Sequence, residues 1–359
     1  MLGTCIAHHL VDAGFEVKVL DLGDPHPTRR VKGVRYRKVD IVTIGEDALE
    51  TLLRDVSVVI HCAGVVDLTS DAAVTFNCHV VGTRNLLRAA QYAGVACFVQ
   101  TSSSGAVTTP YAQCSLMNLP ADFCPSYRKA LLQNDYPCFS SYSSTKFIAE
   151  QMALACHNDA FFRVCALRFP MIYGLSDPMI VGPLLSGKLT HVPDTGNAIS
   201  EFCYVENAAA AHVAAVSQLL KGNGRCFRRV FNVTNGDMPR PSICVWNLLI
   251  EAVNEKAGRR VLEPLKTIHA TALRAIALIS QFIFWLFCGH VPARKHPFWN
   301  LTLASLSLSC TSITQDVSET RSCLEFEPLY DTEGSFDHML HDWLPPQELV
   351  QDPLRCVIS

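Results

Sequence analysis

Short apolar runs rich in valine and isoleucine recur along the first 235 residues, and segments with the period of a helix separate them. The runs that predict strands are residues 16–20, 34–39, 56–62, 96–101, 162–169 and 229–233, and the predicted helices are residues 2–13, 46–53, 76–92, 143–157 and 205–220. Strands that are apolar throughout and alternate with helices indicate a parallel sheet covered on both faces. We therefore predict a doubly wound α/β fold, in which ligands bind beyond the carboxyl ends of the strands.

The alternation stops after about Asn235, and two further helices are predicted at residues 243–257 and 267–289. We expect residues 1–235 to form the main α/β domain, with some substrate-lobe segments from about residue 175. Residues 236–359 would form a smaller substrate-binding lobe.

The most apolar stretch of this lobe is residues 275–289, "AIALISQFIFWLFCG". It is shorter than the ~20 residues that a membrane-spanning helix needs. Its aromatic side chains cover most of the helix circumference, which favours a helix embedded in or lying on a membrane. The alternative is a buried amphipathic helix.

Composition narrows the class of protein. The formal net charge of −3, without long basic runs, gives no reason to expect a nucleic-acid partner. The 16 cysteines include no CxxC pair and no Cys/His cluster at zinc spacing, so we expect no metal site and reduced thiols in a reducing compartment. Apolar residues make up 49% of the chain and charged ones 18%, which predicts large buried surfaces, membrane contact or both.

Candidate chemistry lies in "SSYSSTKFIAEQ", residues 140–151. Tyr142 and Lys146 are four residues apart, so on a helix they share one face. A nearby ammonium group favours the phenolate and would lower the pKa of Tyr142, making it a usable general acid/base. Upstream, "FVQTSSSGAV" is an apolar strand that ends in hydroxyl residues, and a serine there could orient a substrate oxygen.

Two more segments belong to the same pattern. "VVIHCAGVVD" ends a strand in small residues, as the close approach of a flat cofactor requires, and "FNCHVVGTRNLLRAA" places Asn77 near the start of a helix. With "YSSTK", "ALRFPMIYG" and "FCYVENAAAAH", this order of motifs resembles the extended short-chain dehydrogenase/reductases. Within that group it looks most like the 3β-hydroxysteroid dehydrogenase/isomerase branch, and the resemblance covers about residues 2–343.

The resemblance assigns roles residue by residue. Tyr142 matches the acid/base and Lys146 the residue that lowers its pKa and holds the nicotinamide ribose. Ser103 matches the substrate-orienting serine, with Ser102 or Ser104 as alternatives if the register shifts by one. Asn77 matches the helix asparagine of the catalytic set. The implied cofactor contacts are Gly3, Asp21, Asp40, Ile41, Ala63, Tyr142, Lys146 and Pro170, and the carboxylate of Asp21 favours NAD over NADP because it would repel a 2′-phosphate.

The chain departs from the family pattern in two places. Of the glycine fingerprint TGxxGxxG only the last glycine is present, as Gly3, and the first strand is apparently missing. Either the recorded sequence lacks its true N-terminus, or the protein is a degenerate member with weak cofactor binding. The segment between Ser103 and Tyr142 is also long and irregular, and we interpret it as a substrate-side loop or an aberrant exon.

The resemblance implies an NAD-dependent oxidoreductase that oxidises the 3β-hydroxyl group of a steroid or sterol. One alternative is a non-catalytic or weakly cofactor-binding member. Another is a nucleotide-sugar epimerase or dehydratase, for which Arg228, Arg229 and Arg240 are the basic residues available to bind a diphosphate. We further expect membrane association through residues 275–289 and allow for a homodimer. The expected location is the endoplasmic reticulum membrane with the active domain facing the cytosol, or alternatively the cytoplasm.

Overall fold

A four-stranded parallel sheet forms the centre of the computed structural model, which describes residues 1–66, 72–107, 116–119, 141–194, 198–288, 306, 309–341 and 343. The strand order is β11-β6-β4-β3, and every pairing is parallel. The four strands are β3 (Val58–His61), β4 (Cys97–Ser103), β6 (Arg163–Phe169) and β11 (Arg229–Asn232). They match four of the predicted apolar runs, and the parallel α/β fold is confirmed.

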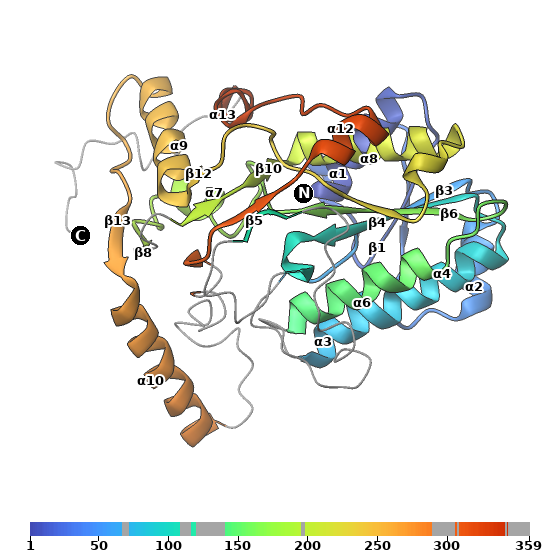
Figure 1. Cartoon of the computed structure of the whole chain (residues 1–359), viewed down its shortest axis with the longest axis horizontal. Helices are drawn as coiled ribbons and strands as arrows, with labels where there is room; N and C mark the ends of the chain where they lie inside the picture. Colours follow the sequence, from blue (N-terminus) through green and yellow to red (C-terminus); the bar gives the residue numbers. More distant parts are fainter. Residues whose placement is uncertain are drawn as a thin grey trace.

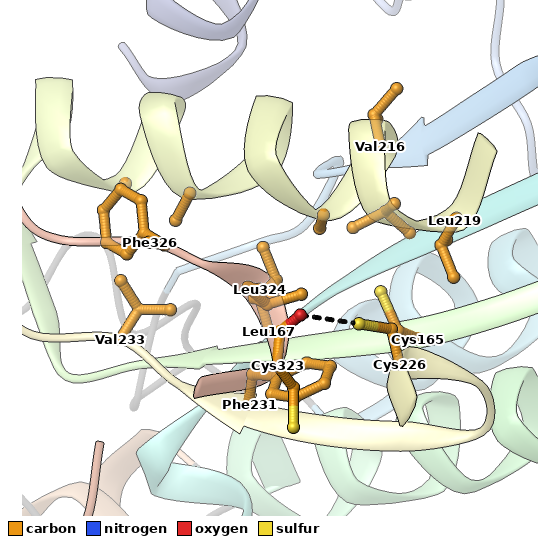
Figure 2. Close-up of a cluster of buried hydrophobic side chains, with 14 of the residues drawn as sticks. Cys165, Leu167, Val216, Leu219, Cys226, Phe231, Val233, Cys323, Leu324 and Phe326 are labelled. Atoms are coloured by element: carbon orange, nitrogen blue, oxygen red, sulfur yellow. Dashed lines mark hydrogen bonds between the residues drawn. The ribbon is translucent and has the colours of Figure 1, made fainter. Parts of the chain in front are cut away.

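Helices cover both faces of this sheet (Figure 1). One face carries α1 (Leu2–Asp12), α8 (Val205–Leu220) and α12 (Ser318–Leu324), and the other carries α2 (Glu46–Leu53), α4 (Gly82–Tyr92) and α6 (Ser141–Ala155). An apolar core lies on each face of the sheet, and alternate residues of a strand belong to one or the other because successive side chains point to opposite faces. Val99 and Leu167 pack with α8, as Figure 2 shows for Leu167, whereas Phe98 and Ala166 pack against the other layer.

A separate two-stranded parallel sheet lies beside the central one. It pairs β1 (Lys18–Asp21) with β2 (Arg35–Lys38). Among the described strands, none links this pair to β3 by hydrogen bonds. The two strands were predicted from residues 16–20 and 34–39, and their central residues were placed correctly.

Further short strands and helices lie outside the central sheet, and a second apolar core there includes Trp246, Leu249 and Phe336. A mixed sheet has the order β12-β9-β14-β5, and two parallel pairs are β10-β7 and β13-β8. The strands are β5 (Leu116–Leu119), β7 (Met171–Tyr173), β8 (His191–Asp194), β9 (Ile199–Ser200), β10 (Phe202–Tyr204), β12 (Arg240–Pro241), β13 (Lys266–His269) and β14 (Ile313–Gln315). The helices are α7 (Val181–Leu185), α9 (Ser242–Lys256), α10 (Ala270–Cys288) and α13 (Thr332–Leu340).

Two predicted helices differ from the structure. Residues 76–92 are not one regular helix: α3 (Ala72–Phe76) leads into a π-helical turn, η2 (Asn77–Val81), and then into α4. The predicted helix at 267–289 begins with strand β13, whose residues hydrogen-bond with β8. Pairing with a distant strand overrides the local helical pattern there.

Helix α10 extends away from the rest of the chain (Figure 1). Leu273 and Ala277 are buried with Leu306, whereas Ile279, Phe282 and Leu286 are among the large apolar residues that stay exposed. No helix among the described residues meets the length and hydropathy needed to cross a membrane. Most of the predicted substrate-side segment, residues 108–115 and 120–140, lies outside the described residues, as do the side chains of Phe284, Trp285 and Phe287.

Candidate active site

Tyr142 lies in the first turn of α6, beside the carboxyl end of β4, where a doubly wound fold places its ligands. Its hydroxyl group is hydrogen-bonded to Ser103, and this bond favours the phenolate. Burial has the larger effect, so the pKa of Tyr142 is raised above its usual range. The sequence predicted that Lys146 would lower the pKa of Tyr142. In the structure the pKa of Tyr142 is raised instead, and that prediction is wrong for the protein without cofactor.

Lys146 follows one helical turn later on the same face of α6. Its Nζ donates a hydrogen bond to the carbonyl oxygen of Thr101 at 3.4 Å, and burial lowers its pKa. A Cβ at Gly64, in the loop after β3, would lie 3.0 Å from this Nζ. Gly64 thus lets the loop approach the ammonium group closely, and any side chain there would force a shift.

The first two of the three consecutive serines after Thr101 form hydrogen bonds with different partners. Ser103 caps the turn η3 (Ser104–Ala106) by accepting a hydrogen bond from Gly105 N at 3.1 Å. A Cβ at Gly105 would lie 3.3 Å from Ser103 Oγ and 3.7 Å from Tyr142 Cε1. Ser102 instead donates to Glu150 at 2.7 Å. Of the serines that the sequence left open, Ser103 is the one hydrogen-bonded to Tyr142.

Glu150 is a site-supporting residue that the sequence reasoning missed. It is fully buried and forms an ion pair with Arg168 of β6, with distances of 2.6 Å and 2.8 Å to the guanidinium. Together with Ser102, this pair connects α6 to β4 and β6, two helical turns after Tyr142. The sequence did contain a signal for it: Tyr142, Lys146 and Glu150 follow one another four residues apart, so all three lie on one face of a helix.

Asn77 and its neighbour His79 occupy different environments. Asn77 is exposed on the π-helical turn, whereas His79 is buried with its ring 5.5 Å from the ring of Tyr142, edge to face. A Cβ at Gly64 would lie 3.3 Å from His79 Nε2. The structure therefore brings His79 to Tyr142 and Lys146, whereas the role of Asn77, exposed on the same turn, stays a prediction. The sequence contained the signal as a histidine two residues beyond the asparagine that the motif suggested.

The predicted cofactor contacts divide into two groups. Gly3 lies next to the end of β3, since a Cβ there would be 3.5 Å from Cys62 Sγ, and Ala63 is exposed immediately after it. Asp21 ends β1 with an exposed carboxylate that accepts a bond from Gly23 N at 3.3 Å. Small residues after β3 and an exposed carboxylate at the carboxyl end of β1 fit a dinucleotide.

The remaining predicted contacts are partly engaged with the protein. Asp40 accepts hydrogen bonds from Val42 N and from the Thr43 hydroxyl, both at 2.9 Å. The Ile41 side chain packs against α4 at Gly82, where a Cβ would come within 2.9 Å of it. Pro170 connects β6 to β7 and is half-buried.

Comparisons with known proteins show the family of the chain. The model described as the 3-beta hydroxysteroid dehydrogenase/isomerase family matches residues 1–255. A "Sterol-4-alpha-carboxylate 3-dehydrogenase, decarboxylating" from Bos taurus is 25% identical over 263 residues, which cover 72% of this chain and 68% of that protein. A "2-alkyl-3-oxoalkanoate reductase" from Stenotrophomonas maltophilia is 29% identical over 256 residues, covering 70% of this chain and 72% of that protein.

Among solved structures, "MoeE5 in complex with UDP-glucuronic acid and NAD" superposes with a TM-score of 0.64 at 20% identity, covering 95% of this chain and 94% of that one. At this identity the likeness concerns the fold.

Proposed function

Because the chain belongs to the 3-beta hydroxysteroid dehydrogenase/isomerase family, we propose that it is an NAD-dependent oxidoreductase that oxidises the 3β-hydroxyl group of a steroid or sterol. The observation that carries the proposal is the hydrogen bond between Tyr142 and Ser103, formed beside the buried Lys146 at the carboxyl end of β4. The name of the bovine relative, a sterol 3-dehydrogenase, supports this substrate class.

The residues have separate tasks in this reaction. Ser103 donates to or accepts from the substrate oxygen and orients it, while Tyr142 as phenolate accepts the proton of the 3-hydroxyl group. Lys146 stabilises that phenolate and holds the nicotinamide ribose. The absence of a side chain at Gly64 leaves room beside the Lys146 Nζ. Asp21 accepts hydrogen bonds from the adenosine ribose. NAD, when bound, supplies the acceptor for the hydride from the carbinol carbon.

The arginines considered for a nucleotide sugar are poorly placed for that alternative. Arg228 and Arg229 lie at the amino end of β11, opposite to the end of the sheet that carries Tyr142. Arg229 pairs with Glu319 at 2.7 Å, and Arg240 pairs with Glu333 at 2.9 Å. Guanidinium groups already neutralised by carboxylates are weak candidates for a diphosphate site.

The test is formation of NADH by the purified chain with NAD and a 3β-hydroxysteroid, compared with the 3α-hydroxy epimer and with UDP-glucose. We expect turnover of the 3β-hydroxysteroid alone. Conversion of UDP-glucose to UDP-galactose or to a 4-keto sugar without net NADH, followed by chromatography of the nucleotide sugars, would favour the epimerase or dehydratase hypothesis. Failure to bind NAD at millimolar concentration would favour the non-catalytic hypothesis.

We also propose that α10 lies on a membrane surface, in the endoplasmic reticulum with the active domain in the cytosol. Its exposed apolar residues follow the spacing of one helix face, opposite the buried Leu273 and Ala277. They are Ile276, Leu278, Ile279, Phe282, Ile283 and Leu286. The described cysteines are free thiols, as expected on the reducing side of that membrane.

Charges on this face should release the protein from vesicles. We expect the double variant Ile279→Asp/Phe282→Asp to reduce co-sedimentation with phosphatidylcholine/phosphatidylserine vesicles at least tenfold, because each side chain contributes about 1.5–3 kcal/mol when buried. Phe161→Asp, at a lone aromatic residue that is 80% exposed, is the control and should bind as the wild type does. Equal binding by all three proteins would contradict the proposal.

A further inference from the structure

His79 connects two elements of the candidate site through an ordered chain of hydrogen bonds. The amide N–H of Val65, in the loop after β3, donates to His79 Nε2 at 3.1 Å. Nε2 is therefore unprotonated, and the proton of the neutral ring lies on Nδ1, which donates to Thr145 Oγ1 at 2.8 Å. The Thr145 hydroxyl in turn donates to the carbonyl oxygen of Tyr142 at 3.1 Å. These three hydrogen bonds run in one direction, from Val65 through His79 and Thr145 to Tyr142.

The π-helical turn explains why His79 reaches this position. Gly82 N donates to Asn77 O, five residues earlier, so the turn is wider than in an α-helix. Such single turns inside α-helices recur at functional sites. The turn buries His79 against the ring of Tyr142 and leaves Asn77 exposed.

We propose that His79 is a positioning residue for the oxidoreductase reaction: one imidazole holds the loop 62–66 and the first turn of α6 in a fixed relation, and so aligns Tyr142 with the cofactor that this loop contacts. This inference rests on the proposed function. His79 acts through Val65 and Thr145 and makes no contact with the reacting atoms.

The charge state of His79 suits this role. Burial, with smaller contributions from the nearby Lys146 and His61, lowers the pKa of His79 to about 3. The titratable groups that face it are Lys146 and Tyr142 on α6 and His61 at the end of β3. The pKa of Tyr142 is raised by burial, and that of His61 is lowered to about 3, mainly by burial. The ring stays neutral through the range in which dehydrogenases work, and its two nitrogens keep their opposite hydrogen-bonding roles.

Three substitutions separate the two contacts. His79→Phe keeps the ring and removes both hydrogen bonds. His79→Asn retains a donor near the position of Nδ1, and His79→Gln retains an acceptor near that of Nε2. The control is His157→Phe: this histidine also accepts a backbone bond, from Val164 N at 3.0 Å, but lies beyond the other end of α6, about 20 Å along the helix from Tyr142.

Two readouts test the proposal. With NAD and a 3β-hydroxysteroid, we expect His79→Phe to lose about 10²-fold in kcat with a smaller change in the KM for NAD, because a small misplacement of a catalytic group has effects of that size. The Asn and Gln variants should fall between Phe and wild type. Ultraviolet difference titration against matched Tyr142→Phe proteins should also give a pKa of Tyr142 about one unit higher in His79→Phe, since its bond to Ser103 weakens.

The titration needs no turnover, so it tests the positioning role even if the protein oxidises no steroid. An unchanged Tyr142 pKa in His79→Phe would overturn the proposal. Equal effects of His157→Phe on kcat and on the Tyr142 pKa would do the same, because they would reduce the role of His79 to general stability.

Discussion

Tyr142→Phe is expected to lose about 10³-fold in kcat with a 3β-hydroxysteroid while it binds NAD as the wild type does. Phenylalanine keeps the ring that packs against His79 and removes only the hydroxyl group that is bonded to Ser103. Steady-state NADH absorbance gives kcat, and fluorescence titration gives the NAD affinity.

Tyr92→Phe is the matched control, because Tyr92 ends α4 and is 68% exposed. Its kcat should equal that of the wild type. If Tyr142→Phe kept kcat within tenfold of the wild type, Tyr142 would not be the acid/base.

Glu150→Ala should lower the free energy of unfolding by about 3–5 kcal/mol, because it leaves the guanidinium of Arg168 buried without its carboxylate. Urea denaturation measures this change, provided that the free energy of unfolding depends on urea concentration with the same slope in both proteins. The double variant Glu150→Met/Arg168→Met removes both charges and should recover part of the loss.

The comparison for this prediction is an exposed pair. Glu50 and Arg54 face each other one turn apart on α2, and Glu50→Ala should change the free energy of unfolding by no more than about 0.5 kcal/mol. Equal losses at Glu50 and Glu150 would mean that the buried pair has no special part in fixing α6 to the sheet.

The central sheet was predictable because its strands are apolar throughout and its cores follow simple alternation, as Phe98 and Val99 illustrate. The π-helical turn was not, because it depends on how residues 77–81 pack against α6 and not on their local apolar pattern. The choice of His79 over Asn77 depends on that turn. Strand β13 was missed because its partner β8 lies more than 70 residues earlier in the chain.

The sequence predicted that Tyr142, Lys146 and Ser103 lie close together, and the structure places them so. The family match is confirmed over residues 1–255, whereas the catalytic roles and the division at residue 235 stay predictions. The electrostatics were not predictable from spacing: the sequence placed a lysine near Tyr142, but burial decides the direction of the pKa shift of Tyr142. Burial depends on elements from the whole fold.

The most direct test of the account follows deuterium from the 3α position of a 3β-hydroxysteroid during oxidation with NAD. Wild-type protein should yield equal amounts of the 3-ketosteroid and of deuterium-labelled NADH. Tyr142→Phe should form both products far more slowly. Ketone formed without deuterium in the nucleotide, or the same labelled product at an undiminished rate from Tyr142→Phe, would contradict it.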